Sequence, residues 1–219
     1  DTASKLDGSA VYGIDVKLPG MLHGALAQCP TLGGKLASFD ASAAEAMPGV
    51  KKVVGTPNGV VVVADHYWQA RKALDAVKIS WDAGPNAALS TDAVRAKLRS
   101  AAKREGRPAR SEGDVAAAMK GAAKVVRATY ELPMLAHATL EPQCCTADVR
   151  PDGADIHAPT QTQTIAQATA AAAAGLKPEQ VNIHTTLLGG GFGRRLEVDF
   201  IPAAVAASKA VGQPVKVIW

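Results

Sequence analysis

The sequence predicts an α+β fold, and three observations in its first third indicate this class. Residues 10–39 form short runs in which apolar and polar side chains alternate between Pro-Gly and Gly-Gly pairs, as strands and turns do. The run Val60–Val63 is apolar on both faces, which is typical of a strand covered on both sides. Ala70, Leu74 and Val77 recur at helical spacing, so we expect one face of a helix to cover a sheet.

The elements of the first 82 residues follow from these patterns. Strands are expected at residues 10–16, 21–28, 35–39, 50–54, 59–65 and 77–81. One helix is expected at residues 42–47, capped by Asp40, and another at residues 66–77, capped by Asp65. Two helices crossing one sheet would make residues 1–82 a first folded unit.

The rest of the chain is expected to hold a connection and a second unit. Residues 83–113 combine loop, an amphipathic helix and a polar linker, and we interpret them as an inter-domain connection. Residues 114–219 form the second unit, with helices expected at 115–121, 163–174 and 197–212 and strands at 123–132, 144–150, 154–158, 181–188 and 214–219. We expect the last strand to leave an open sheet edge that promotes self-association.

Composition excludes several classes of protein. The chain has 219 residues, of which 47% are hydrophobic, an ordinary share for a soluble globular protein. It has no apolar run of about 18 residues, so no transmembrane segment is expected, and its start lacks a signal-peptide pattern. The net charge of +4 comes from scattered residues without interleaved aromatics, which argues against nucleic-acid binding. The three cysteines do not form zinc-ligand pairs, and we expect small buried side chains.

The stretch Leu187–Arg195, LLGGGFGRR, is the main functional candidate. Glycines between a strand and a helix can turn their N–H groups inward as an anion nest, to which the helix dipole adds positive potential. Arg194 and Arg195 could add charge-assisted hydrogen bonds. The spacing excludes both a P-loop and a dinucleotide-binding fingerprint. The alternative is a flexible turn, although Phe192 inside the run argues against it.

Two further segments carry polar side chains of interest. Thr160-Gln161 lies between an expected strand and helix, which leaves the Gln161 amide free to bond a polar group at the edge of the sheet. His137 and Glu141 are four residues apart in HATLEP, but two ligands do not make a metal site. We interpret His137 as a satisfied structural histidine and Glu141, like Glu197, as structural.

These motifs together resemble the molybdenum hydroxylases of the xanthine oxidase and aldehyde oxidoreductase family. The similarity covers nearly the whole chain, and GGGFGRR combined with the Thr-Gln of APTQTQT is its most specific part. GFGRR with HATLEP is most similar to the branch that holds the isoquinoline 1-oxidoreductase β-subunits and the molybdopterin-binding aldehyde dehydrogenases. The resemblance implies that residues 1–82 are an α/β hammerhead domain and that residues 114–219 are the first part of a molybdopterin-binding domain.

The resemblance also implies residue roles. It implies that the cofactor is bound by Gln161, Gly190, Gly191, Phe192, Gly193 and Arg194. Gln161 would hydrogen-bond an oxygen ligand of molybdenum, and the backbone at Phe192 and Gly193 would approach the metal and the pterin. No residue of the chain is expected to ligate the metal directly. Leu196 stands where the purine-oxidising enzymes carry a glutamate, so an aldehyde or an N-heterocycle fits better than a purine.

The implied function is part of a catalytic subunit that hydroxylates such a substrate with water. The cofactor would be molybdenum–molybdopterin, with the cytosine dinucleotide form as a candidate. Iron–sulfur clusters are expected in a partner subunit, and a general-base glutamate beyond residue 219, so the chain alone should be inactive. Bacterial relatives often carry a twin-arginine signal, which favours the periplasm over the cytoplasm. A stand-alone anion-binding or scaffold module without catalysis is the alternative.

Overall fold

The computed structural model describes residues 2–219, which divide into two compact units. The first unit combines the chain up to Ala87 with His137–Trp219, and the second is Ala88–Ala136. Residues 1–82 and 114–219 were expected to form separate units, whereas in the structure parts of both belong to the first unit. The mixed α+β class is confirmed.

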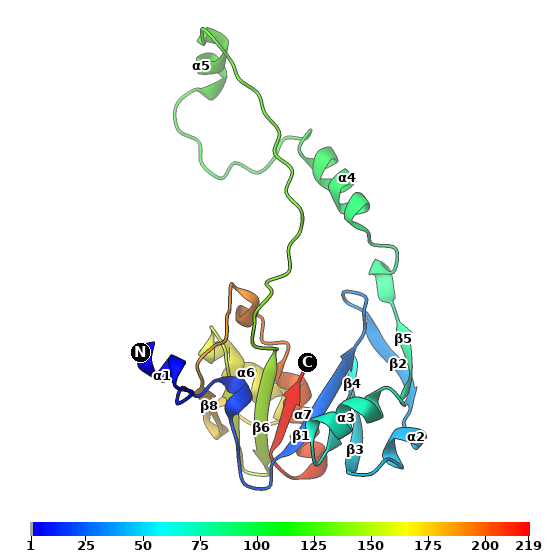
Figure 1. Cartoon of the computed structure of the whole chain (residues 1–219). Coiled ribbons are helices and arrows are strands. Elements are labelled where there is room, and N and C mark those ends of the chain that lie inside the picture. The colour runs from blue at the N-terminus through cyan, green and yellow to red at the C-terminus, as the bar shows by residue number, and fades with distance from the viewer. Residues whose placement is uncertain (1) are drawn as a thin grey trace. The chain divides into compact units, whose positions relative to one another are not determined.

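A seven-stranded sheet in the order β3-β4-β1-β9-β6-β7-β8 forms the centre of the first unit (Figure 1). Its strands are β1 (Leu22–Gln28), β3 (Val50–Thr56), β4 (Gly59–Ala64), β6 (Cys144–Arg150), β7 (Gly153–Ala158), β8 (Val181–Thr185) and β9 (Val215–Ile218). A separate antiparallel pair consists of β2 (Lys35–Asp40) and β5 (Lys78–Asp82). Since β1, β3 and β4 share the sheet with β6–β9, the expected boundary does not separate two sheets.

The last strand, β9, lies inside the sheet, so the expected open edge at residues 214–219 is wrong. Val215 pairs with Leu22 in a parallel ladder with β1 and with Ala147 in an antiparallel ladder with β6. Val215 and Val217 are fully buried beneath helices, and such burial is worth roughly 1.5–3 kcal/mol per valine. Pairing with β1 on one side and β6 on the other thus makes β9 a central strand.

Helices cover the two faces of the sheet differently. The helices are α1 (Thr2–Leu6), α2 (Ser42–Glu45), α3 (Tyr67–Leu74), α4 (Thr91–Ala101), α5 (Val115–Gly121), α6 (Gln163–Ala174) and α7 (Ile201–Val211). Val61 and Val63 belong to one core with α6 and α7, whereas Val60 and Val62 belong to another with α3. Alternate residues of β4 therefore face opposite layers, as predicted for a doubly covered strand.

Several predicted boundaries shift. Ala70, Leu74 and Val77 are buried as predicted, but the helix begins at Tyr67, and its N-cap is His66 instead of Asp65. The expected strand at residues 10–16 is reduced to a bridge between Tyr12 and Leu187 and a 3-10 turn. The C-terminal helix begins at Ile201 and not at residue 197.

The second unit contains α4 and α5 but forms no strand within its residues 88–136. The predicted strand at 123–132 is therefore wrong, because an alternating segment becomes a strand only where a neighbouring backbone pairs with it. Arg99 instead joins α4 to this segment through two hydrogen bonds to Glu131 at 2.8 and 3.0 Å. Across residues 2–219, no helix combines the length and apolar character needed to cross a membrane.

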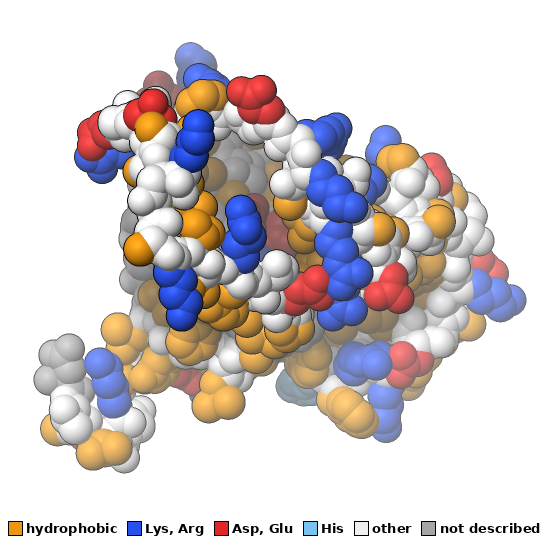
Figure 2. All heavy atoms as spheres, turned by 90° about the horizontal axis from the view of Figure 1, so that it is seen from above, with side chains coloured by type: hydrophobic (Ala, Val, Ile, Leu, Met, Phe, Trp, Pro, Cys, Tyr) orange, Lys and Arg blue, Asp and Glu red, His pale blue; other side chains and the backbone are white. Residues whose placement is uncertain are grey.

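The surface charge is dispersed, as the sequence predicts. On the face in Figure 2, Lys and Arg side chains occur in small groups with acidic and hydrophobic side chains between them. Within the described residues, several basic side chains are paired with carboxylates, among them Lys51 with Asp65 and Arg150 with Asp148 and Asp155.

Candidate functional site

The glycine run lies between β8 and α7, which confirms its predicted place between a strand and a helix. A 3-10 turn, Arg194–Leu196, follows the run, and α7 begins only at Ile201. The amino end of α7 therefore does not continue directly from the glycines, and the expected contribution of its dipole to the run is not supported.

The backbone of the run adopts angles that favour glycine. Gly190 and Gly193 have φ values of 104° and 88°. Phe192 also has a positive φ, 52°, and its side chain is 71% exposed. A non-glycine residue in this region carries strain of roughly 1–3 kcal/mol, which surrounding contacts must offset. An exposed, strained aromatic argues that the run is a built loop and not a flexible turn.

Consecutive backbone donors of the run have no protein acceptor. Within residues 2–219, no hydrogen bond uses the N–H groups of Gly190, Gly191, Phe192 or Gly193. The carbonyl groups of Gly191 and Gly193 are used, since they accept from Arg194 N at 2.8 Å and Leu196 N at 3.2 Å. The loop thus satisfies carbonyls internally and leaves successive N–H groups for an oxygen-rich ligand.

Gln161 lies against this loop, as the resemblance implied. Its N–H donates to Arg195 O at 3.1 Å, and Thr160 Oγ1 donates to the same oxygen at 3.3 Å. A Cβ built on Gly191 would lie 2.8 Å from Gln161 Oε1, so the end of the Gln161 side chain lies directly against the backbone of Gly191. The Gln161 side chain is exposed, and its amide makes no hydrogen bond within the described residues. The structure therefore brings Gln161 together with Gly190–Gly193.

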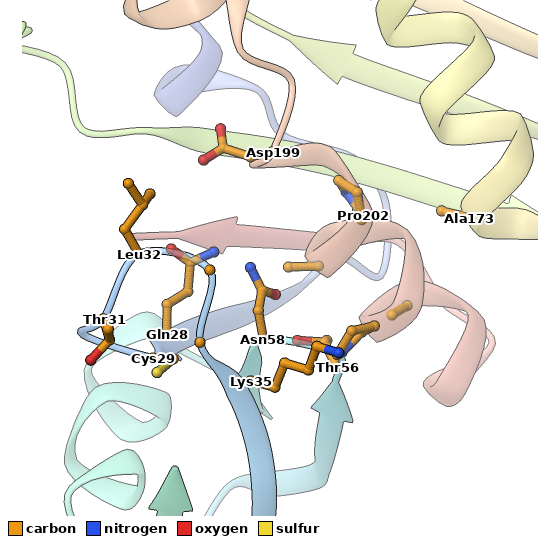
Figure 3. A pocket seen from close by; sticks show the side chains of 15 residues that line it. Gln28, Cys29, Thr31, Leu32, Lys35, Thr56, Asn58, Ala173, Asp199 and Pro202 are labelled. Carbon is orange, nitrogen blue, oxygen red and sulfur yellow. The ribbon is translucent and has the colours of Figure 1, made fainter. Parts of the chain in front are cut away.

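Arg194 was expected to offer its guanidinium to an anion, but in the structure this group is already paired with a carboxylate. Its guanidinium donates to both carboxylate oxygens of Asp199, at 2.9 and 3.0 Å, and lies 5.3 Å from the ring centroid of Trp219. Asp199, which sequence reasoning missed, also lines a pocket (Figure 3). There Gln28 and Asn58 extend toward the start of α7. The pocket thus adjoins the glycine run through the Arg194–Asp199 pair.

Arg195 is fully buried, so the expectation that it binds an external anion is wrong. Its Nε donates to Gly190 O and its Nη1 to Gln143 Oε1, both at 2.8 Å. Its Nη2 donates to Glu141 Oε2 at 2.8 Å and to Glu141 O at 3.0 Å. Burying a guanidinium requires such partners, because an unpaired buried charge is very costly. Gln143 was missed in the sequence, although it lies two residues after Glu141 in LEPQ.

Glu141 was interpreted as structural, and in the structure it is a buried acceptor of hydrogen bonds. Its Oε1 accepts from Ile14 N at 2.9 Å and its Oε2 from Gly189 N at 2.9 Å, besides its bond to Arg195. Burial of the thiol and, to a smaller extent, the charge of Glu141 raise the pKa of Cys144 to about 12.

His137, interpreted as a satisfied structural histidine, is instead exposed, and no hydrogen bond of residues 2–219 involves its ring. Among those residues, no cluster of three or more His, Cys, Asp or Glu is arranged to hold a metal ion.

Known proteins resemble the chain in sequence and fold. A family model for the molybdopterin cofactor-binding domain matches residues 98–219. The β-subunit of isoquinoline 1-oxidoreductase from Brevundimonas diminuta is 31% identical over 229 residues, covering 100% of this chain and 29% of that protein. The membrane-bound aldehyde dehydrogenase (pyrroloquinoline-quinone) of Gluconacetobacter polyoxogenes is 34% identical over 229 residues, covering 100% and 30%. Aldehyde oxidoreductase from Desulfovibrio gigas shares the fold, with a TM-score of 0.76, 21% identity and coverage of 99% of this chain and 29% of that chain.

The chain spans less than a third of the length of these relatives. The match to the family model covers more than half of the chain and includes Gln161 and the whole glycine run. The relatives carry the names of aldehyde and N-heterocycle oxidoreductases, as the resemblance implied. The chain therefore belongs to the molybdopterin cofactor-binding domain family.

Proposed function

We propose that this chain is the part of a catalytic subunit that holds the molybdenum–molybdopterin cofactor for oxidation of an aldehyde or an N-heterocycle. The observation that carries the proposal is the series of unpartnered N–H groups from Gly190 to Gly193 beside the free amide of Gln161. Oxo ligands of a metal and the ionised phosphate oxygens of a pterin are hydrogen-bond acceptors, so they match donors that face no protein acceptor. The residues present therefore fit the group.

Each residue of the site has a defined task in this proposal. The Gln161 amide donates to an oxygen ligand and orients it. The open space around Gly193, where a Cβ would meet no atom within 4 Å, admits close approach of the cofactor to the backbone. Phe192 presents an exposed ring beside this approach and excludes water when a ligand covers it. Arg194 closes the turn of the run through its N–H, which donates to Gly191 O, while its guanidinium binds Asp199.

The bound cofactor supplies the two-electron redox chemistry, with water as the source of the oxygen atom. For an aldehyde the balance is aldehyde plus water to carboxylic acid, two protons and two electrons. The electrons leave through a partner, for which we propose an iron–sulfur subunit. Relatives that are named as subunits, such as one of a nicotinate dehydrogenase from Pseudomonas putida, support an assembly of several chains. The nucleotide form of the pterin and the periplasmic location remain predictions.

The test uses the natural enzyme that carries these residues, purified from a host that makes the cofactor. We expect stoichiometric molybdenum and dye reduction with aldehydes or isoquinoline-type heterocycles. Gln161→Ala should lower the rate more than molybdenum retention, because it removes one hydrogen bond to a metal ligand, roughly a 10–100-fold effect for such groups. Gln163→Ala, a change of the same type two residues away on α6, serves as the matched control. Wild-type turnover in Gln161→Ala, or an enzyme without molybdenum, would contradict the proposal.

A further inference from the structure

We propose that Glu141 and Arg195 are positioning residues for the glycine run, and that this buried pair turns the peptide groups of the run so that their N–H groups face the cofactor. The inference rests on the proposed function, since it assigns tasks within the same site. Neither side chain reaches the exposed side of the loop: Arg195 is 0% and Glu141 8% exposed. Both side chains bond the backbone of the run from its buried side, at Gly189 N and Gly190 O.

Arg195 sets the orientation of one peptide group directly. Its Nε donates to Gly190 O at 2.8 Å, which holds this carbonyl toward the buried guanidinium. The peptide bonds of residues 2–219 are trans, and a trans peptide directs its C=O and N–H in opposite directions. The N–H of Gly191, on the same peptide group as Gly190 O, therefore points away from Arg195. No described residue accepts a hydrogen bond from this N–H.

Glu141 fixes the start of the run in the same way. Its Oε2 accepts from Gly189 N at 2.9 Å and from Arg195 Nη2 at 2.8 Å, so one oxygen joins the loop to the guanidinium. A Cβ on Gly189 would overlap the Cβ of Glu141, which shows how closely the backbone approaches. Its Oε1 accepts from Ile14 N and ties the N-terminal turn to the same point.

The guanidinium is suited to this task because it is planar and forked. It bonds Gly190 O, Gln143 Oε1 and two oxygens of Glu141 at once. These bonds fix the plane of the group and, through it, the plane of the peptide that follows Gly190. A lysine keeps the charge but offers a single ammonium without a planar fork, so it cannot hold all of these acceptors in one orientation.

A purely structural role and a positioning role make different predictions for a paired apolar replacement. Removing one partner, as in Arg195→Met, leaves an unpaired buried charge and should destabilise the fold. Removing both, as in the double variant Glu141→Leu with Arg195→Met, often restores stability, because neither member of the pair is left buried without its partner. The double variant nevertheless lacks the bonds to Gly189 N and Gly190 O. If the pair is structural only, cofactor retention should recover with stability; if it positions the loop, retention should stay low.

The experiment compares the natural enzyme with the double variant, with Arg195→Lys and with the control Arg150→Met, which removes an arginine from a surface ion-pair cluster on β6. Three quantities are measured: the unfolding temperature, the molybdenum content, and amide hydrogen exchange of the glycine run in cofactor-free protein. We expect the double variant to unfold near the wild-type temperature, to exchange the Gly189 amide at least about tenfold faster, and to retain molybdenum about 10–100-fold less. The control should match the wild type in molybdenum content and in exchange of the run.

Wild-type molybdenum content or wild-type exchange at Gly189 in the folded double variant would overturn the proposal. If that variant does not fold, Arg195→Lys decides: reduced molybdenum content at a near wild-type unfolding temperature supports the proposal, and full content overturns it. A wild-type enzyme without molybdenum would contradict the proposed function instead. Hydrogen exchange in cofactor-free protein would then still decide whether the pair positions the loop.

Discussion

Phe192 and the glycines around it adopt a backbone shape that their own sequence does not enforce. Gly190 and Gly193 tolerate positive φ, but Phe192 must be held there by its neighbours. The hydrogen bonds from Arg194 N to Gly191 O and from Leu196 N to Gly193 O close successive tight turns around it. These turns therefore hold the loop in a shape in which the N–H groups of Gly190–Gly193 stay available to a ligand.

Gly193→Val should abolish molybdenum retention in the natural enzyme. Valine at φ 88° is strained by roughly 1–2 kcal/mol, and its side chain would fill the space that is open beside Gly193. Gly20→Val is the matched control, because Gly20 also has a positive φ, 67°, and open space around it, but lies far along the chain from the run. Both variants should lose similar stability in thermal unfolding. A normal molybdenum content in Gly193→Val would count against the assigned site.

At the scale of secondary structure, the strands that carry the site also carry an ion-pair cluster. Arg150 on β6 donates to Asp148 and Asp155, and His184 on β8 lies 2.7 Å from Asp155 Oδ1. The rings of His157 and His184 stack with centroids 4.4 Å apart. These contacts join β6 to β7 and β8, and the ends of β7 and β8 lead toward Gln161 and the glycine run.

This cluster predicts a defined acid sensitivity. Hydrogen bonds from His184, and next from Arg150, lower the pKa of Asp155 to about 2. Because the folded-state pKa lies below the ordinary value of 3.8, the stabilisation is complete above about pH 4 and is lost as the pH falls toward 2. Asp155→Asn should therefore unfold more easily than the wild type at pH 7, and the difference in unfolding free energy should vanish near pH 2. Asp152→Asn in the adjoining turn is the control; a difference for Asp155→Asn that persists at pH 2 would refute this explanation.

Features of the fold that depend on local pattern were predicted from the sequence, whereas features that depend on pairing between distant segments were missed. The alternation of apolar residues located most strands, and the glycine run lies where its neighbours placed it. The position of β9 between β1 and β6 could not be read locally, because its partners are residues 22–25 and 144–147. The same limit explains the wrong strand at 123–132, whose pattern was suitable but which has no partner in its unit.

The site shows a similar division. Gln161 and the glycines were predicted through the resemblance of their motifs to a known family, and the structure places Gln161 beside Gly191. The burial of Arg195 was missed, because an arginine after a glycine run suggests an anion ligand unless its carboxylate partner is known. That partner, Glu141, lies in another segment of the chain. Charged residues near a candidate site thus need a structure before they can be divided between ligand binding and support.

Residues 1–219 alone should neither retain the molybdenum cofactor nor oxidise an aldehyde. The run and Gln161 offer donors on one side only, and these lie on half-buried or exposed surface. A tightly held cofactor needs most of its surface enclosed and its charges paired. The relatives are more than three times as long as the share this chain matches, so most of the enclosure should come from elsewhere. The measurement is the molybdenum content and aldehyde-dependent dye reduction of the chain, purified beside the natural enzyme from one host. Stoichiometric metal with turnover in the chain alone would show that these residues already enclose a complete site.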